Sequence, residues 1–319
     1  MLYVSWLVLG MSLLSSMGDG VDERLLEVLR DAQTTHRDAW ARGRARLVVE
    51  ISKPKTITPA KIEGEIVWRD PAFVLKCKVS DPDAVFFRDR GIGMDREWNF
   101  IAKGKDFVVR YFARTNTLSE QGSLVGALQP TYELSPFKVF ASCCPPNNSH
   151  GRPWSELVGP SPNMPESSKS SKFAYRRLEN GDIEQSRKDE SGDRNTILFS
   201  AKEDLAVASL VGYHSSGELR RRLSYRYTRR PDGKIVAATC DVDFSAGGGS
   251  VTHYKYTFFD LILGGAVPES EFARDAVVAR IKRETDYGRN PKRQAGHEAD
   301  DAQLESAAKA LREKGTAKP

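Results

Sequence analysis

The sequence predicts a mainly β protein with added helices, of the α+β class. Apolar residues recur every three or four positions in a stretch before Gly43 and again in "ESEFARDAVVARIKRE", which indicates two amphipathic helices. Between these stretches, apolar and polar residues alternate with a period of two over most of roughly 200 residues, which indicates strands with one dry and one wet face. Tight turns separate several of these strands, so neighbouring strands are expected to pair antiparallel.

The composition suits a globular chain with a heavily charged surface. The chain has 319 residues, of which 39% are hydrophobic, enough to bury a core. Its 48 basic and 43 acidic residues leave a net charge of +5, which gives only weak support to a polyanionic partner.

The N-terminus predicts export. The apolar run from Leu2 to Leu14 is shorter than the roughly 20 residues that a transmembrane helix needs, but it has the length of a signal-peptide core. Ser16 and Gly18 stand at the −3 and −1 positions of a cleavage site before Asp19. We therefore expect residues 1–18 to be a signal peptide, no transmembrane segment in the mature chain, and a periplasmic or secreted protein. A buried first helix or an uncleaved anchor is the alternative.

The first helix of the mature chain is expected to begin after Asp22, which can cap it, and to end near Gly43. One apolar stripe runs along this helix, formed by Leu25, Leu26, Leu29, Ala32, His36, Ala39 and Trp40. A lone histidine on such a stripe is more often a core or boundary residue than a ligand.

Strands follow from Arg44. Three alternating stretches come first, and then "EWNFIA" and "DFVVRYFA" flank a turn at Gly104 and predict a hairpin. Residues 114–172 break the rhythm because they are rich in Pro, Ser, Asn and Gly, so we expect a long loop insert of the kind that forms lids or binding loops. A long antiparallel meander runs on from Lys172. A single domain over residues 19–284 and a charged, disordered tail over residues 285–319 complete the prediction.

The stretch "ELRRRLSYRYTRRPDGK" poses the question of nucleic-acid binding. In a strand, Arg220, Arg222 and Arg226 share one face, whereas Tyr225 and Tyr227 share the other face with leucines. A nucleic-acid reader needs aromatic and basic side chains on the same exposed face. We therefore expect these arginines to meet acidic partners across the sheet, and we expect no nucleic-acid partner.

Four cysteines leave two interpretations open. In an oxidising compartment, Cys77 and Cys240, on predicted inward-facing strand positions, can form disulfides with Cys143 or Cys144 of the loop. Alternatively, Cys77 and Cys240 are small core residues.

The sequence carries no motif for a nucleophile elbow, a phosphate loop, a dinucleotide site or a zinc site. "DPD" at 81–83 and "DVD" at 241–243 offer oxygen ligands for calcium, but they fit a turn and the wet face of a strand better. We therefore predict no catalytic residues, no metal and no cofactor. An enzyme such as a hydrolase, with residues gathered from distant strands, is the less favoured alternative.

A sheet with this many strands must hide its inner face, and the two amphipathic helices are the available covers. An apolar pocket is left wherever helix and sheet do not meet perfectly. The residues expected to line it are Trp68, Phe73, Leu75, Trp98, Phe100, Tyr225, Tyr227, Tyr254, Tyr256 and Phe258. Most of them also fit an ordinary core.

The order of these elements, with "VWRDPAFVLKC" in the second and third strands and "GGAVPESEF" after the last strand, resembles the LolA-like carriers of outer-membrane lipoproteins and their LppX-like and RseB-like relatives. The resemblance covers residues 20 to 275. It implies a strongly curved antiparallel sheet, or incomplete barrel, covered by one or two amphipathic helices, with an apolar cavity for acyl chains.

Two main functional hypotheses follow. The first is an exported, non-enzymatic carrier or sensor of a lipid or an acylated protein, with the first helix and the 114–172 loop as its gate. The second is an exported structural or protein-interaction module with a solid core. The sequence does not fix the oligomeric state.

Overall fold

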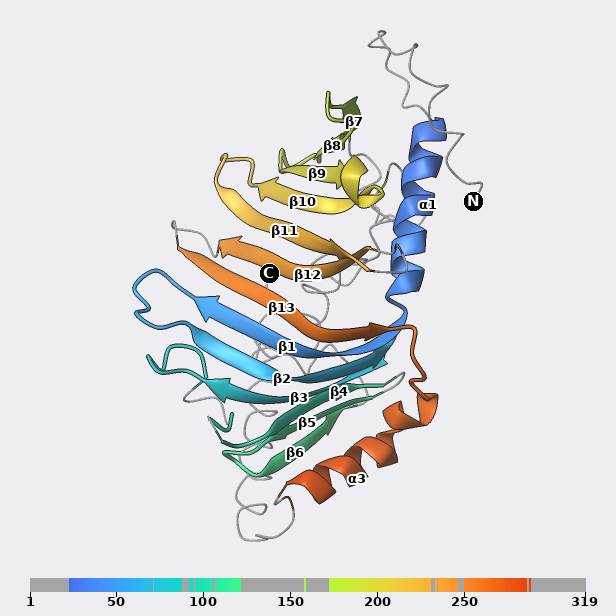
Figure 1. Ribbon diagram of the computed structural model, residues 1–319. Coiled ribbons are helices and arrows are strands. Elements are labelled where there is room, and N and C mark those ends of the chain that lie inside the picture. Colours follow the sequence, from blue (N-terminus) through green and yellow to red (C-terminus); the bar gives the residue numbers. More distant parts are fainter. Residues whose placement is uncertain are drawn as a thin grey trace, which may run out of the picture.

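One antiparallel sheet of thirteen strands dominates the computed structural model (Figure 1). The structure describes residues 23–70, 72–87, 92–94, 96–104, 107–121, 158, 172–230, 233, 235–245, 250–285 and 287. The predicted signal peptide and all of the predicted tail except Thr285 and Tyr287 lie outside this part of the chain. Within it, no helix combines the length and apolarity needed to cross a bilayer.

The sheet is preceded by α1 (Glu23–Ala39) and followed by the 3-10 helix η5 (Glu269–Phe272) and α3 (Arg274–Glu284). The strands of the first half are β1 (Arg42–Ser52), β2 (Ala60–Arg69), β3 (Ala72–Ser80), β4 (Asn99–Lys103), β5 (Val108–Phe112) and β6 (Thr117–Gln121). Those of the second half are β7 (Lys172–Arg177), β8 (Ile183–Lys188), β9 (Arg194–Ser200), β10 (Ala206–Tyr213), β11 (Leu219–Arg229), β12 (Ile235–Ser245) and β13 (Val251–Leu263), with the 3-10 turn η4 (Ala201–Glu203) before β10.

The first and last strands lie side by side in the middle of the sheet. The strand order is β6-β5-β4-β3-β2-β1-β13-β12-β11-β10-β9-β8-β7, and the register pairs Val49 of β1 with Tyr256 of β13. Because β6 and β7 lie at opposite edges, residues 122–171 link one edge of the sheet to the other. The sheet is curved and does not close, which confirms the predicted class of a curved antiparallel sheet with helical cover (Figure 1).

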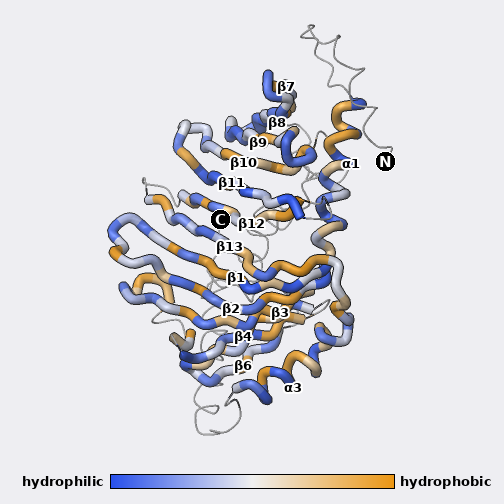
Figure 2. Tube along the Cα trace, in the orientation of Figure 1, coloured by the Kyte–Doolittle hydropathy of each residue, from blue (hydrophilic) through white to orange (hydrophobic). Residues whose placement is uncertain are grey.

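The two faces of the sheet differ in chemistry because side chains alternate along each strand. In β1, Leu47, Val49 and Ile51 are buried on one face, which we call the apolar face. Arg46 and Glu50 lie on the opposite face, which we call the polar face. Figure 2 shows this alternation as successive orange and blue segments along the central strands.

The two helices cover opposite faces. Leu26 and Leu29 of α1 belong to the same buried cluster as the apolar face. Val277 and Ile281 of α3 instead join a second cluster with outward-facing residues of β3, β4 and β5. A salt bridge of 2.7 Å between Lys76 and Glu284 ties α3 to β3. Each predicted amphipathic helix therefore covers its own face of the sheet.

The predicted bounds of two elements need correction. The first helix ends at Ala39 rather than near Gly43, because β1 already begins at Arg42. The predicted loop over 114–172 contains β6, whose residues Thr117–Gln121 pair with β5. The polar sequence "TLSEQ" shows little apolar alternation, because this strand lies at the edge of the sheet.

Candidate functional site

The apolar face is one continuous hydrophobic cluster that spans both halves of the sheet. It takes buried residues from α1, from β1 through β4, and from β8 through β13. Phe86, Phe87 and Ile92, between β3 and β4, join the same cluster. Val158 also joins it and accepts a hydrogen bond at its carbonyl oxygen from Arg30 Nε of α1, at 3.2 Å. A residue of the connection between the two edges thus contacts the helix that covers this face.

Only three side chains of α1 are buried, namely those of Leu26, Leu29 and Gln33. The Gln33 amide Nε2 donates a hydrogen bond of 2.6 Å to the carbonyl oxygen of Leu205, and His36 Nε2 lies 3.0 Å from the carbonyl oxygen of Asp204. These two bonds, which we call the latch, join the C-terminal half of the helix to the turn between η4 and β10. Burial lowers the pKa of His36, although its hydrogen bond and proximity to Asp204 partly oppose this. Burial at this position therefore favours the neutral imidazole, and the bond to Asp204 only partly offsets it.

The turn that receives the latch is strained. Asp204 and Leu205 have φ angles of 51° and 59°, which places two successive non-glycine residues in the left-handed region. Such residues cost roughly 1–2 kcal/mol each, and they persist where the surroundings hold them. The bonds from α1 thus act on a turn whose conformation already costs free energy.

The C-terminal end of α1 is fixed more firmly. Trp40 is buried, stacks on Trp68 of β2 and meets the ring of Phe258 of β13 edge-on. The C-terminal half of the helix is therefore held by the two hydrogen bonds of the latch and by the packing of Trp40 beyond its end.

Eight of the ten predicted lining residues lie together on the apolar face. They are Trp68, Phe73, Leu75, Tyr225, Tyr227, Tyr254, Tyr256 and Phe258. Trp98 and Phe100 lie in the other cluster, with α3. Asn99 and Ile101 point to the apolar face, so Phe100 must point away from it. Both faces of β4 are covered, and hydrophobicity alone therefore could not tell which face Phe100 occupies.

The two described cysteines are completely buried on the apolar face. Burial raises the pKa of Cys77 to about 12 and raises that of Cys240 as well. Cys143 and Cys144, the predicted disulfide partners, lie outside the described residues.

Polar residues interrupt the apolar face at positions that were not predicted to be buried. Arg110 of β5, Gln185 of β8 and Arg221 of β11 are all buried. The sequence pattern does indicate that Arg221 points inward, because it lies two residues from Leu223 and four from Tyr225 in β11 and so shares their face. The three neighbouring arginines, Arg220, Arg222 and Arg226, lie on the other face of the strand.

The arginines on the polar face meet acidic partners, as predicted. Arg226 pairs with Asp241 at 3.1 Å and Arg222 with Asp243 at 3.9 Å, both across the β11–β12 ladder. Arg220 pairs with Asp193, which precedes β9, at 3.0 Å.

The two aspartate motifs have structural roles among the described residues. Asp81 accepts backbone hydrogen bonds from Phe86 and Phe87 and so shapes a turn. Asp243 lies 2.7 Å from His253 on the polar face. No group of three or more metal-binding side chains occurs in the part of the chain that the structure describes.

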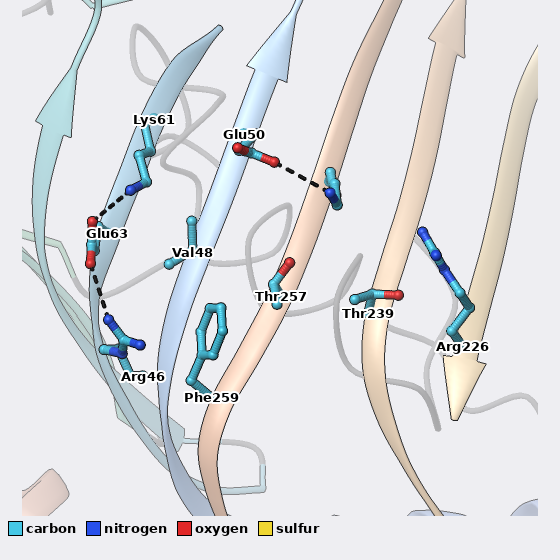
Figure 3. A pocket seen from close by; sticks show the side chains of 10 residues that line it. Arg46, Val48, Glu50, Lys61, Glu63, Arg226, Thr239, Thr257 and Phe259 are labelled. Carbon is cyan, nitrogen blue, oxygen red and sulfur yellow. Dashed lines mark hydrogen bonds and ion pairs between the residues drawn. The ribbon is translucent and has the colours of Figure 1, made fainter. Parts of the chain in front are cut away.

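A shallow depression of about 450 Å³ lies on the polar face, over β2, β1, β13, β12 and β11 (Figure 3). Its lining residues are Arg46, Val48, Glu50, Lys61, Glu63, Arg226, Thr239, Lys255, Thr257 and Phe259. Figure 3 shows Glu63 between Lys61 and Arg46, with which it forms ion pairs of 2.8 and 3.4 Å. The depression is thus mixed in charge, and none of the predicted lining residues belongs to it.

No protein-family model and no curated protein sequence matches this chain. Among solved structures, it is similar to a domain assigned to outer membrane lipoprotein sorting, from Vibrio parahaemolyticus, with 11% identity over 79% of this chain and 97% of that chain and a TM-score of 0.45. It is also similar to a LolA superfamily protein from Nitrosomonas europaea, with 9% identity over 78% and 98% of the two chains and a TM-score of 0.45. A DUF1329 family protein from Desulfovibrio piger matches with 11% identity over 79% and 98% of the chains, again with a TM-score of 0.45. Structures of the LolA superfamily and of outer membrane lipoprotein sorting are thus among those to which the chain is similar.

Proposed function

We propose that this protein is an exported, non-enzymatic carrier or sensor that holds an acyl chain, of a lipid or a lipoprotein, between the apolar face of the sheet and α1. The observation that carries this proposal is the way α1 covers the face. It covers a hydrophobic cluster that spans both halves of an unclosed sheet, yet it buries only two apolar side chains of its own, Leu26 and Leu29.

Burial of the two leucines of α1 and burial of an acyl chain on the same face contribute comparable free energies. Burying two leucine side chains stabilises the docked helix by roughly 3–6 kcal/mol, and each buried methylene of an acyl chain contributes about 0.8 kcal/mol. An acyl chain of about eight methylenes can therefore replace the apolar contacts of α1 without a net loss. The aromatic and aliphatic character of the face suits such a chain better than it suits a polar metabolite.

The latch supports a gating role for α1. Gln33 and His36 hold the helix to a turn whose left-handed residues are strained, and releasing the helix allows that turn to relax. The firm packing of Trp40 keeps the C-terminal end of the helix in place. The proposed motion is therefore a swing of α1 about Trp40.

Export is part of the proposal and rests on the N-terminal sequence. The apolar run of residues 2–14 and the small residues before Asp19 fit a cleaved signal. The mass and N-terminal sequence of the mature protein, expressed with its own leader, test this directly. A mature chain that begins at Asp19 is expected, and an intact N-terminus in the cytoplasm contradicts it.

The binding experiment starts from the chain beginning at Asp19, purified without detergent. Native mass spectrometry followed by organic extraction is expected to show a stoichiometric lipid, and the delipidated protein is expected to bind dodecanoic acid at one site. Leu29→Glu places a charge under α1 and is expected to weaken binding at least tenfold. Val28→Glu is the matched control, because Val28 is 48% exposed on the same helix. A protein that carries no lipid and binds none contradicts the proposal.

The second candidate is an exported protein-interaction module. The depression on the polar face favours it, because Phe259, which is 40% exposed, lies there among charged side chains. Under this candidate the delipidated protein binds no acyl chain. Phe259→Ser then weakens the binding of a defined partner, whereas Leu29→Glu does not.

A further inference from the structure

Exposed apolar side chains lie on the polar face, along the central strands β1 and β13. Phe259 is 40% exposed and Ile262 is 52% exposed. They pair with Arg46 and Arg44, which are two residues apart on β1, so the irregular register of β13 brings both side chains to one face. Val48 lines the depression together with Phe259 and is half-buried (Figure 3). We call Val48, Phe259 and Ile262 the outer strip.

The outer strip continues the surface that α3 already covers. Residues of α3 form one buried cluster with Val74 of β3, and Val67 of β2 packs against the same cluster. The register leads from Val74 to Val67, from Val67 to Arg44 of β1, and from Arg44 to Ile262 of β13. Ile262 therefore lies two strands beyond the edge of the surface under α3.

A second row of cross-strand neighbours leads from the end of α3 to Phe259. Glu284, the last residue of α3, pairs with Lys76 of β3 at 2.7 Å. The register leads from Lys76 to Glu65 of β2, then to Arg46 of β1 and to Phe259 of β13. These three strand spacings amount to roughly 14 Å. The helix α3 thus covers the polar face over β3, β4 and β5 and stops short of the outer strip.

The sequence after α3 carries another apolar stripe, in residues that lie outside the described part of the chain. Leu304, Ala308 and Leu311 recur at steps of four and three, which is the spacing of one helix face. Acidic residues precede this stripe and basic residues follow it, the order that a helix dipole favours: Asp300, Asp301, Arg312 and Lys314. A helix this short is marginal in isolation, so it gains stability by burying its stripe.

The chain between α3 and this stripe is long enough to reach the outer strip. Tyr287 lies edge-on to Tyr111 of β5 on the polar face, with ring centroids 6.1 Å apart. Five strand spacings, roughly 24 Å, separate β5 from β13. Sixteen residues lie between Tyr287 and Leu304, and an extended chain of that length spans up to roughly 50 Å. Because the stripe is tethered to the same molecule, a contact of low intrinsic affinity is enough to dock it.

We propose that the segment of residues 300–312 docks as a helix on the outer strip of its own molecule, with Leu304 and Leu311 against Phe259 and Ile262. The C-terminal region then covers the polar face with two successive helices, α3 over β3, β4 and β5 and this segment over β1 and β13. Contiguous exposed apolar side chains mark interaction sites, and the segment supplies matching apolar side chains. The inference goes beyond the proposed function and does not depend on the acyl-chain site.

Photocrosslinking in the chain that begins at Asp19 locates the segment. The photoreactive residue p-benzoylphenylalanine replaces Phe259 and keeps an aromatic ring there, and the irradiated protein is mapped by peptide mass spectrometry. Adducts are expected in peptides that contain Leu304 or Leu311. The same photoreactive residue in place of Ile57 is the matched control, because Ile57 is 92% exposed and lies between β1 and β2. It is expected to give at least tenfold less of these adducts.

A mixture of unlabelled and isotope-labelled chains identifies the molecule that supplies the segment. Adducts that join peptides of the same isotopic label support docking within one molecule. Adducts that join the two labels in statistical proportion identify a second copy as the occupant and overturn the proposal. The absence of adducts with residues 300–312 overturns it too.

Amide hydrogen exchange gives a second readout that needs no photoreactive residue. Residues 304–311 of the chain that begins at Asp19 are expected to exchange at least tenfold more slowly than the same sequence in a free peptide. The double variant with Phe259→Ser and Ile262→Ser is expected to lose this protection. Val28→Ser, at a residue of α1 that is 48% exposed, is the control and is expected to keep it.

Circular dichroism melts confirm that the variants are folded, as expected for substitutions at exposed positions. Exchange of residues 304–311 at the rate of the free peptide overturns the docking of the segment. Protection that survives in the double variant shows that the segment packs elsewhere and overturns the assignment to the outer strip. Neither measurement uses lipid binding, so both outcomes are independent of the acyl-chain site.

Discussion

Trp40 and Trp68 stack with ring centroids 5.7 Å apart, and the Trp68 indole Nε1 donates a hydrogen bond of 2.7 Å to the Trp40 carbonyl oxygen. The contact joins the residue that follows α1 to β2, the neighbour of the central strand β1. Phe258 of β13 adds an edge-on contact at 5.5 Å. One buried ring thus fixes the helix to strands from both ends of the chain.

Trp40→Ala is therefore expected to destabilise the whole domain. Removing a buried aromatic side chain from a packed core costs about 3–5 kcal/mol of the free energy of unfolding. Urea unfolding monitored by circular dichroism measures this loss. Ile57→Ala is the control, because Ile57 is almost fully exposed, and its effect is expected to stay within about 0.5 kcal/mol. A loss below about 1 kcal/mol in Trp40→Ala contradicts the anchoring role.

At Gly64, the backbone of β3 lies close to β2. A Cβ atom at this position would lie 2.0 Å from the carbonyl oxygen of Lys76 and 2.7 Å from the Cα atom of Cys77, so backbone must move to accept any side chain. Gly64→Ala is expected to cost about 1–3 kcal/mol of stability or more. Gly265→Ala is the matched control, because its added Cβ would meet only the Ile262 side chain at 3.5 Å. Equal urea midpoints for the two variants contradict this account.

The buried thiols are expected to be inert in the folded protein. Burial raises the pKa of Cys77 to about 12, so its reactive thiolate is scarce at pH 8, and the pKa of Cys240 is raised too. In a variant with Cys143 and Cys144 replaced by serine, a thiol reagent at pH 8 is expected to label neither residue before unfolding and both after it. Rapid labelling of the native variant contradicts their burial.

His36 is expected to make the docking of α1 depend on pH. Its pKa in the folded protein lies below the ordinary value of 6.5, so the undocked or unfolded chain binds a proton more readily than the docked state. Docking is therefore unaffected well above pH 6.5 and weakens as the pH falls from 6.5 toward the lowered pKa. Urea midpoints at pH 7.5 and 5.5 measure this change, and His36→Gln is expected to show a smaller difference than the unmodified chain. The same difference in both proteins contradicts the role of His36.

The sequence allowed the faces of single strands to be predicted better than the arrangement between strands. Alternation in β11 correctly placed Arg222 and Arg226 on the face opposite Tyr225. Side chains alternate with a period of two, so the face of one residue in a strand fixes the face of all its neighbours. The meeting of β1 and β13 in the middle of the sheet could not be predicted from local pattern, because it depends on pairing across most of the chain.

The candidate site was predicted only in part for a similar reason. The aromatic residues of the apolar face were found because they alternate with polar ones, but Phe100 was misleading because both faces of β4 are buried. Arg221 was not predicted as a buried residue, although it alternates with the inward residues of β11, and only the register with Gly212 and the strands beyond shows what surrounds it.

The most direct test of the central claim is to locate a bound acyl chain. A dodecanoate analogue with a photoreactive group at its chain end is bound to the delipidated protein, irradiated, and mapped by peptide mass spectrometry. The account predicts adducts on the apolar face near α1, in peptides that contain Leu29 or Val207. Adducts confined to peptides of the polar face around Val48 and Phe259, or no adduct above that of an unfolded control, would contradict it.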